Sequence, residues 1–334
     1  MAVIIACRNE ENYIGGCIQS LLRNDYPEDL LEIVVCDGRS ADKTREVVKS
    51  FTEEYDHIRL IDNPGKTAPL GFNAGIRSTT SDVVIILSAH AEVARDFISK
   101  NIRLLEDTPE AGASGGWMES MHKDAKSKAI GKALSSSFGV GNALFRTASR
   151  EGFADTVVFG AYRREVFNKT GLFDEELVRN QDDEFNYRVR KAGYRLIHSN
   201  SIRSRYFVRS SYGKLFRQYF QYGYWKVYVN RKHRTVTTIR QVVPFMFVAF
   251  LITGLALSLL WSPFLYIYLS VLLIYLFTAA VESASKGDTM KQFGMILKAF
   301  VTLHVAYGLG YLSGIFRFVL FRAKPSERSK RLTR

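Results

Sequence analysis

The stretch Ile33-Val34-Val35-Cys36-Asp37-Gly38-Arg39-Ser40 contains the pattern that decides the fold: a short β-branched run that ends on a carboxylate and a glycine turn. An amphipathic segment follows it, with Val47, Val48 and Phe51 on one face. Short β-branched runs are typical of strands that are buried on both sides, whereas apolar residues three to four positions apart indicate a helix. The stretch therefore predicts one strand, a turn and one helix.

The same pattern recurs along the first ninety residues. Further apolar runs are Val3-Ile4-Ile5, Ile58–Ile61 and Val83–Leu87, and an amphipathic stretch, Ile14–Leu22, lies after the first of them. Strands that alternate with helices predict an α/β fold with a mainly parallel, twisted sheet covered by helices on both faces. Ligands of such sheets bind beyond the carboxyl ends of the strands. We therefore expect the functional residues directly after each apolar run.

The composition of the chain excludes several classes of protein. With 334 residues, 47% hydrophobic and 24% charged, the chain is neither disordered nor collagen-like. Its three cysteines show no C-x-x-C spacing, which argues against a disulfide scaffold or a zinc site and favours a reducing compartment. The formal net charge of +13 suits nucleic acid, an anionic membrane or a phosphorylated substrate.

The position of the charge favours a membrane. Ten Lys or Arg residues lie between Arg203 and Arg240, and Gln241–Val281 then contains no charged residue. A helix needs about 20 apolar residues to cross a bilayer, so this stretch predicts a hairpin of two helices, 242–261 and 264–281, separated at Ser262-Pro263. The alternative is a buried helix pair of a water-soluble protein, but such helices rarely run so long without a charge.

A third apolar stretch, 293–321, contains Lys298, His304 and Arg317, so it could cross the membrane or lie at its interface. Lys and Arg residues precede the hairpin and recur in the tail, and the positive-inside tendency therefore predicts that both ends of the hairpin lie in the cytosol. The run Ala2–Cys7 is too short for a secretory signal. We expect the chain at the plasma membrane with its N-terminal domain on the cytosolic face.

These patterns predict four regions: a cytosolic domain (1–200), basic and aromatic interface helices (201–240), membrane helices (241–321) and a basic cytosolic tail (322–334). Aromatic and basic residues are mixed in 206–232, as in segments that settle at a bilayer interface. A nucleic-acid patch is the alternative, but no recognised RNA- or DNA-binding motif is present, so we expect membrane lipid and no nucleic acid as a partner.

Polar residues cluster in three places: Asp37–Ser40, Ser88–Glu92 and Asn180–Gly193. Taken singly, each has an ordinary structural explanation. The first is common turn chemistry, and a lone histidine such as His90 is more often a hydrogen-bonded loop residue than a metal ligand. Acids in the first turn of a helix and bases in its last turn suit the helix dipole without any catalysis.

The order of these clusters carries more information. Short matching pieces follow one another along residues 1–200: Ile4–Glu11, Val35–Asp42, Gly65-Lys66, Asn73-Ala74-Gly75, Phe159–Arg164, Gly171–Glu175 and Asp182–Arg188. The ordered set resembles the family 2 glycosyltransferases, whose GT-A fold is a Rossmann-like sheet with flanking helices. The pair His90-Ala91, the string Asn180–Glu184 and the membrane hairpin are similar to the membrane-associated transferases of succinoglycan-type exopolysaccharide assembly.

The resemblance implies roles for individual residues. Asp37 matches the aspartate that recognises the nucleotide base, usually uracil, with Arg8 and Glu10 in the wall of the same pocket. Asp182 matches the general base, which takes the proton of an acceptor hydroxyl while the sugar is transferred with inversion. A carboxylate near a helix N-terminus keeps a low pKa, in agreement with that role. Further contacts with substrate or nucleotide are implied for Lys66, Ser88, Asp183, Arg188, Gln218 and Trp225.

The second acidic motif departs from the family. Most relatives carry Asp-x-Asp there and hold Mg²⁺ or Mn²⁺ on the diphosphate, whereas this chain has Ser88-Ala89-His90. Imidazole suits Mn²⁺ better than Mg²⁺. The hypothesis is that His90, with Glu92, holds Mn²⁺ and that Mg²⁺ supports the reaction poorly.

The resemblance implies transfer of one sugar from a nucleotide-diphosphate sugar, with UDP-hexose favoured, to a polyprenyl-linked saccharide. Processive synthases carry a Gln-x-x-Arg-Trp motif, but the stretch Gln218–Trp225 lacks the arginine before the tryptophan, and few crossings follow it. Two alternatives stay open: a catalytically silent scaffold that binds nucleotide-sugar, and a transferase that uses polyprenyl phosphate itself. The sequence predicts no oligomeric state.

Overall fold

The computed structural model describes residues 1–325 and divides the chain into two compact units. The α/β unit comprises Met1–Glu119 and Leu144–Phe207, and the helical unit comprises Ser120–Ala143 and the chain from Val208 onward. The predicted boundary at residue 200 lies inside strand β9 (Arg195–Phe207), and 120–143, predicted within the first domain, groups with the C-terminal helices instead. Of the predicted basic tail, 326–334 lie outside the described residues.

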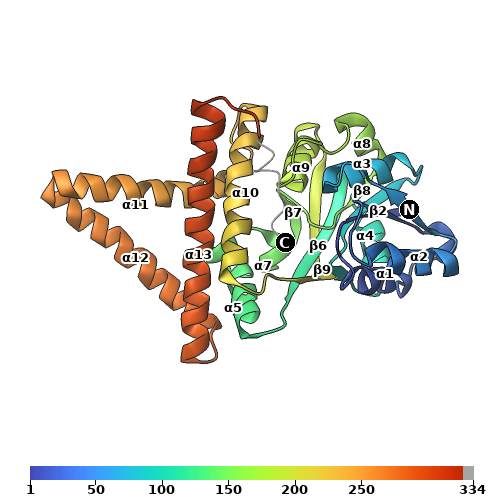
Figure 1. Cartoon of the computed structure of the whole chain (residues 1–334), viewed down its shortest axis with the longest axis horizontal. Coiled ribbons are helices and arrows are strands. Elements are labelled where there is room, and N and C mark those ends of the chain that lie inside the picture. The colour runs from blue at the N-terminus through green and yellow to red at the C-terminus, as the bar shows by residue number, and fades with distance from the viewer. Residues whose placement is uncertain (326–334) are drawn as a thin grey trace. The chain divides into compact units, whose positions relative to one another are not determined.

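The α/β unit is built on one sheet with strand order β3-β2-β1-β4-β8-β6-β9-β5, and β7 pairs with β9 (Figure 1). Neighbours among the first four strands run parallel. They are β1 (Ala2–Cys7), β2 (Glu32–Asp37), β3 (Ile58–Asp62) and β4 (Val83–Ser88). The four apolar runs of the sequence are confirmed as strands. Both faces of β1, β2 and β4 are buried, so these runs need no polar alternation, whereas β3 lies at the edge of the sheet and is only partly buried.

The other half of the sheet was not predicted. Antiparallel pairs join β4 to β8, β6 to β8, β5 to β9 and β7 to β9. These strands are β5 (Ala91–Val93), β6 (Ala111–Met121), β7 (Gly152–Ala154), β8 (Ala161–Arg163) and β9. Three of them are only three residues long, and their partners lie far away in sequence, so no local pattern indicates them.

Helices cover both faces of the sheet, as the sequence predicted. On one face, α1 (Ile14–Leu22), α2 (Thr44–Glu54) and α4 (Phe97–Glu106) pack on odd-numbered side chains such as Val3, Ile5 and Val35. On the other, α3 (Ala68–Arg77), α8 (Arg164–Thr170) and α9 (Gln181–Lys191) pack on even-numbered ones such as Ile4 and Val34. The short elements η1 (Glu28–Leu30) and α7 (Leu144–Thr147) complete the unit.

The helical unit contains four long helices: α10 (Tyr212–His233), α11 (Val243–Leu260), α12 (Ser262–Lys286) and α13 (Met290–Gly314). Its short elements are α5 (Ala125–Leu134), α6 (Ser137–Val140), η2 (Ile239–Val242) and the π-helical η3 (Ile315–Leu320). Within residues 1–325, three helical segments are long and apolar enough to cross a membrane: Ile239–Leu260, Ser262–Lys286 and Met290–Leu320.

The bounds of the hairpin differ from the prediction. The turn consists of Trp261, and Pro263 lies in the first turn of α12 instead of between the helices. A proline is tolerated there because the first turn of a helix has no internal partner for its N–H groups. Because Pro263 fits into the first turn, the second helix begins at Ser262 rather than at 264. It also continues past 281 to Lys286.

Candidate active site at the carboxyl edge of the sheet

The loops after β1 and β2 are interlocked by hydrogen bonds. The backbone N–H of Asn9 donates to the Ser40 hydroxyl (2.8 Å), and the N–H of Ala41 donates to Asn9 Oδ1 (2.8 Å). Next to them, the N–H of Glu10 donates to Thr44 Oγ1 (2.7 Å). The sequence predicted these two loops as walls of one pocket, and the hydrogen bonds hold them side by side after the carboxyl ends of β1 and β2.

Asp37 is the last residue of β2 and is completely buried. Its carboxylate accepts hydrogen bonds from the Ser40 hydroxyl (2.5 Å), the Ser40 N–H (3.1 Å) and the Arg45 guanidinium of α2 (2.8 Å). The ion pair with a buried carboxylate is the first cause of a raised pKa of Arg45. Asp37 thus fixes the loop after β2.

At Gly38, the loop after β3 approaches the loops after β1 and β2. A β-carbon at Gly38 would lie 3.2 Å from Arg8 Cβ and 3.2 Å from Lys66 Cα, which is closer than side chains normally pack. The backbone of Lys66 has a positive φ of 63°, so the loop after β3 turns sharply toward Gly38. Arg8, Asp37 and Lys66, which are far apart in sequence, therefore belong to adjacent loops.

The end of β4 places Ser88 and His90 beside Glu10. The Ser88 hydroxyl lies 3.1 Å from His90 Nδ1, and Glu10 Oε1 lies 3.4 Å from the same nitrogen, with both Glu10 and His90 largely buried. The ring of Tyr206 lies 4.8 Å from the imidazole, centroid to centroid. Sequence reasoning missed Tyr206, because only the pairing of β5 with β9, Ala91 opposite Tyr206, brings it there.

The predicted metal ligands do not form a metal site by themselves. Among residues 1–325, no group of three His, Cys, Asp or Glu side chains is arranged to hold an ion. His90 lies beside Glu10, whereas the Glu92 carboxylate lies next to α1, 3.2 Å from the position that a β-carbon on Gly16 would take. The donor set does not fit a protein-only site.

Asp182 lies in the first turn of α9, and α9 runs from the carboxyl edge of the sheet to the opposite edge. The amide of Asn186, one turn after Asp182, donates to the carbonyl of Val157 (3.0 Å). Val157 is close in the chain to Gly160, whose carbonyl accepts a hydrogen bond from the Ile86 N–H near the end of β4. After α9, Tyr194 packs against Gly112 at the start of β6. The first turn of α9 therefore lies toward the carboxyl side of the sheet, and Asp182, which it carries, is exposed.

A buried polar network holds the first turns of α9. The Tyr162 hydroxyl donates to Asn186 Oδ1 (2.8 Å), and Asn186 Nδ2 donates to Thr156 Oγ1 (2.8 Å) as well as to Val157. Burial, and then the charge of Asp182, raises the pKa of Tyr162. The carboxylate of Asp182 is therefore close to this network. Sequence reasoning missed Asn186, because a buried asparagine inside a helix looks like any surface residue.

Arg188 and Asp183 both belong to α9, but their contacts differ. The Arg188 guanidinium binds Glu184 through two contacts (2.7 and 2.9 Å) and the carbonyls of Thr170 (2.7 Å) and Leu172 (2.8 Å). These contacts fasten α9 to the end of α8, so the structure gives Arg188 a structural role. Asp183 is half-buried next to Asp182, to whose carboxylate its N–H donates (2.9 Å).

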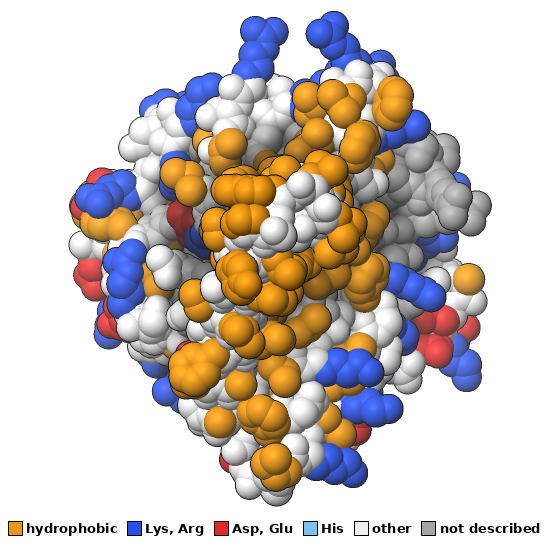
Figure 2. All heavy atoms as spheres, turned by 90° about the vertical axis from the view of Figure 1, so that its left-hand side faces the viewer, with side chains coloured by type: hydrophobic (Ala, Val, Ile, Leu, Met, Phe, Trp, Pro, Cys, Tyr) orange, Lys and Arg blue, Asp and Glu red, His pale blue; other side chains and the backbone are white. Residues whose placement is uncertain are grey.

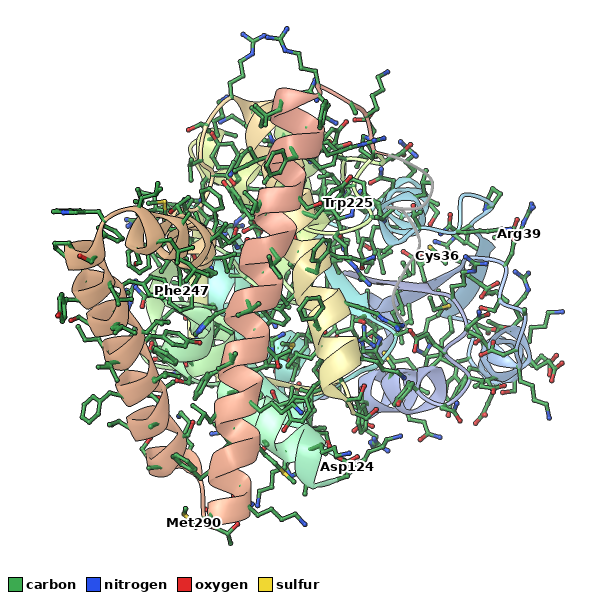
Figure 3. The ribbon with its side chains drawn as sticks, turned by 60° about the vertical axis from the view of Figure 1, so that its left-hand side comes forward. Cys36, Arg39, Asp124, Trp225, Phe247 and Met290 are labelled. Atoms are coloured by element: carbon green, nitrogen blue, oxygen red, sulfur yellow. The ribbon has the colours of Figure 1, made fainter. Side chains whose placement is uncertain are left out.

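Gln218 and Trp225 belong to α10 in the helical unit. Trp225 is completely buried against Tyr228 and Phe318, and Figure 3 shows its place on α10. Its contact with substrate stays a prediction. Gln218 is also buried, and its amide donates to the Tyr222 hydroxyl (2.8 Å). The physical reason is the close packing of α10 on α13, which removes this face of α10 from solvent.

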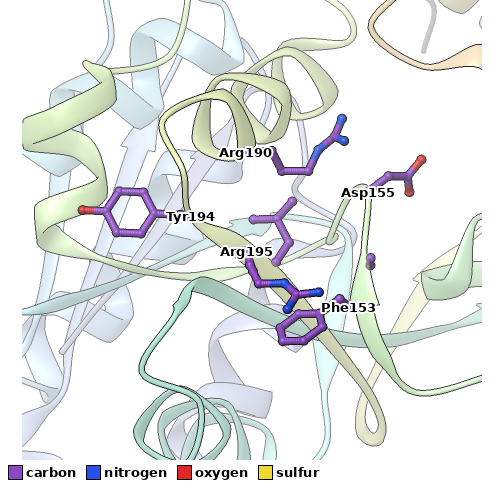
Figure 4. A pocket seen from close by; sticks show the side chains of 7 residues that line it. Phe153, Asp155, Arg190, Tyr194 and Arg195 are labelled. Carbon is purple, nitrogen blue, oxygen red and sulfur yellow. The ribbon is translucent and has the colours of Figure 1, made fainter.

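A pocket of about 310 Å³ lies at the other end of α9 from Asp182 (Figure 4). The guanidinium carbon of Arg195 stacks 3.3 Å from the ring centre of Phe153 there. The residues that line it are Phe153, Ala154, Asp155, Arg190, Tyr194, Arg195 and Leu196. None of the predicted site residues is among them, so this pocket is separate from the site at the carboxyl edge.

The chain is similar in sequence to known proteins. Residues 2–171 match the profile of Glycosyl transferase family 2. The chain is 31% identical over 281 residues to a dolichyl N-acetyl-α-D-glucosaminyl phosphate 3-β-D-2,3-diacetamido-2,3-dideoxy-β-D-glucuronosyltransferase of Methanococcus voltae, covering 82% of this chain and 85% of the relative. It is 30% identical over 246 residues to the succinoglycan biosynthesis protein ExoA of Rhizobium meliloti, covering 72% and 73%.

Two solved structures share the fold at low sequence identity. S. aureus TarS in complex with UDP-GlcNAc superposes with a TM-score of 0.53 at 14% identity, over 93% of this chain and 90% of that one. A Pyrobaculum calidifontis mannosyltransferase in complex with GDP-Man and Mn²⁺ gives 0.51 at 18% identity, over 98% and 76%. The predicted family and the GT-A-like fold are confirmed: the chain belongs to glycosyl transferase family 2.

Proposed function

We propose that this glycosyltransferase moves one sugar, with inversion, from a nucleotide-diphosphate sugar to a lipid-linked saccharide at the cytosolic face of the plasma membrane. UDP-hexose is the proposed donor, and a polyprenyl-linked saccharide of exopolysaccharide or related glycan assembly is the proposed acceptor. The observation that supports the proposal best is that the loops after β1, β2 and β3 meet at Gly38, while the end of β4 places Ser88 and His90 beside Glu10.

The relatives support the finer points. The name of the Methanococcus enzyme describes transfer to a sugar on dolichyl phosphate, and ExoA acts in succinoglycan biosynthesis. TarS binds UDP-GlcNAc in a structure of similar fold. The three apolar helical segments of this chain suit an enzyme whose acceptor stays in the membrane.

The proposed chemistry uses Asp182 as general base. Its carboxylate takes the proton of the acceptor hydroxyl while that oxygen attacks the anomeric carbon, and the bond from that carbon to the nucleotide diphosphate breaks on the opposite side. The helix N-terminus favours the ionised carboxylate, and its exposure leaves it open to an acceptor. Arg8 and Lys66 contribute positive charge near the departing diphosphate, and Ser88, Asp183 and the Asp37 loop are the proposed donor contacts.

The test is transfer of a labelled sugar by membranes that contain the full chain. The donor is a UDP-sugar and the acceptor a polyprenyl-diphosphate-linked sugar. Asp182→Asn is expected to lower the rate about 100-fold or more, because positioned bases contribute on the order of 10²–10⁴. Asp107→Asn, an exposed residue after α4, is the matched control and keeps the wild-type rate.

Each alternative gives a different result in this assay. If wild type and Asp182→Asn transfer the sugar at equal rates, Asp182 is not the general base. Binding of the nucleotide-sugar without any transfer favours the scaffold. Transfer to free polyprenyl phosphate at an undiminished rate in Asp182→Asn favours the alternative in which polyprenyl phosphate itself is the acceptor, because a phosphate oxygen needs no base. Long polymer as the direct product of the pure protein contradicts transfer of a single sugar.

The proposed preference for Mn²⁺ over Mg²⁺ rests on His90, since nitrogen ligands suit Mn²⁺ better than the hard Mg²⁺ ion. The Pyrobaculum structure contains Mn²⁺ together with its nucleotide-sugar. We expect a higher transfer rate with Mn²⁺ and a reduced preference in His90→Ala. Equal rates with both metals, or full activity in a chelator, contradict this expectation.

A further inference from the structure

We propose that, within residues 1–325, the hairpin α11–α12 is the membrane-embedded part and crosses the bilayer twice, whereas α13 lies at the cytosolic surface although its sequence is apolar enough to cross. The partner of the hairpin surface is the phospholipid bilayer. This inference concerns the topology of the chain and does not depend on the sugar-transfer chemistry.

The surfaces of α11 and α12 are apolar and uncovered. Of the most apolar windows of these segments, only 11% and 6% are buried inside the protein. At about 1.5 Å per residue, their 18 and 25 residues are about 27 and 37 Å long, close to the roughly 30 Å of a hydrocarbon core. Figure 2 shows the hydrophobic side chains gathered on this face. Exposed members include Leu255, Leu259, Trp261, Tyr266, Leu273, Ile274 and Phe277.

In contrast, protein covers α13. Of its most apolar window, 56% is buried. One cluster of buried residues joins its N-terminal half to Ala129 and Ile130 of α5 and to Leu215 of α10. Along its C-terminal half, a β-carbon on Gly310 would lie 2.0 Å from the carbonyl oxygen of Phe220, so α10 touches the backbone of α13 (Figure 3).

The helices that cover α13 carry charges that do not belong in hydrocarbon. Lys126 and Lys128 are exposed or half-buried on α5, and Lys214 and Arg217 are exposed on α10. Placing α13 across a bilayer would bring these helices in with it, at a cost of about 2.5–3.5 kcal/mol for each cation near the centre. A surface position of α13 avoids that cost.

Polar contacts hold the turn between α12 and α13 on α5. Lys132 of α5 donates to the carbonyl of Lys286 (2.5 Å) and to the carboxylate of Asp288 (3.0 Å). The Ser136 hydroxyl donates to Glu282 (2.8 Å), the first acidic residue after the apolar stretch. The end of α12 therefore lies on the same side of the membrane as α5.

Chain connectivity shows that this side of the membrane is also the side of the α/β unit. Within residues 1–325, the first helical segment able to cross a membrane begins at Ile239, so α5, α10 and the α/β unit lie on one side of the bilayer. The hairpin leaves from that side and returns to it at Lys286. Since α13 is packed against α5 and α10, it stays there, and so do residues 322–325.

The test is labelling of single cysteines by a membrane-impermeant maleimide in intact cells and in inverted vesicles. The natural cysteines Cys7, Cys17 and Cys36 are all buried, and burial raises the pKa of Cys36 to about 12, so their background is low. The reporters are Ser262→Cys beside the turn, Met290→Cys before α13 and Lys324→Cys after it, all at exposed positions. Ser50→Cys on α2 marks the side of the α/β unit.

We expect Ser262→Cys to react only in intact cells, and Met290→Cys, Lys324→Cys and Ser50→Cys only in inverted vesicles. Labelling of Lys324→Cys in intact cells means that α13 crosses and overturns the inference. Labelling of Ser262→Cys from the side of Ser50→Cys, or only after detergent is added, means that the hairpin does not cross and also overturns it. Each variant is checked for labelling in detergent, which shows that its thiol is reactive.

Discussion

The polar network under Asp182 gives the sharpest prediction about how the candidate base is positioned. Asn186 is completely buried and makes hydrogen bonds with Tyr162, Thr156 and Val157. The substitution Asn186→Leu keeps a similar volume and removes all three bonds. Each buried group left without a partner costs about 1–3 kcal/mol. We therefore expect the opening of α9 to become easier by about 3–5 kcal/mol.

Amide hydrogen exchange of the full chain measures this opening directly. A loss of about 3 kcal/mol corresponds to roughly a 100-fold decrease in the protection of the amides of α9. Tyr162→Phe removes one bond only and is expected to lower protection about tenfold or less. If Asp182 is the base, transfer should slow in Asn186→Leu as well, because the first turn that carries Asp182 is no longer held.

A matched control is available in the same unit. Asn101 on α4 is also completely buried and binds Phe97 and Ser114. Asn101→Leu is expected to lower the protection of α4 and to leave that of α9 unchanged. The reasoning is refuted if Asn186→Leu changes α9 by less than tenfold, or if both substitutions loosen α9 equally.

Three further predictions concern stability. Arg188→Met leaves Glu184, which is 2% exposed, without its ion pair, so we expect a loss of about 3–5 kcal/mol in the free energy of unfolding, seen as a lower thermal midpoint; an unchanged midpoint contradicts the structural role of Arg188. Gly310→Ala forces α10 away from α13 and should cost about 1–3 kcal/mol or more. Gly294→Ala, on the same helix with open space around it, should be neutral or stabilise by up to about 1 kcal/mol, and equal effects of the two would argue against close packing of these helices. The backbone N–H of Ser127 lowers the pKa of the Asp124 carboxyl below its usual 3.8; this cap stabilises α5 above that pH and loses its effect as the pH falls through the lowered pKa, so exchange of the α5 amides should rise in acid in wild type but not in Asp124→Asn.

The sequence by itself determined the parallel half of the sheet and the position of the hairpin. The runs that became β1, β2 and β4 are buried on both faces, so their continuous apolar character is visible without any knowledge of their partners. A stretch of forty-one residues without a charge is equally independent of context. The ordered motifs then identified the family.

Only the tertiary structure decided which side chains meet. Glu10 lies beside His90, Tyr206 reaches the same imidazole through the pairing of β5 with β9, and Asn186 ties α9 to the segment before β8. These contacts join residues up to more than one hundred positions apart, and polar residues of this kind look alike in sequence whether they are buried or exposed.

The same reason separates α13 from the hairpin. Hydropathy reports how apolar a helix is, and it scores all three segments as able to cross a membrane. What covers that apolar surface, lipid or protein, depends on the neighbours that the fold supplies. Here α5 and α10 supply them to α13 and leave α11 and α12 uncovered, a distinction that no periodicity along the chain contains.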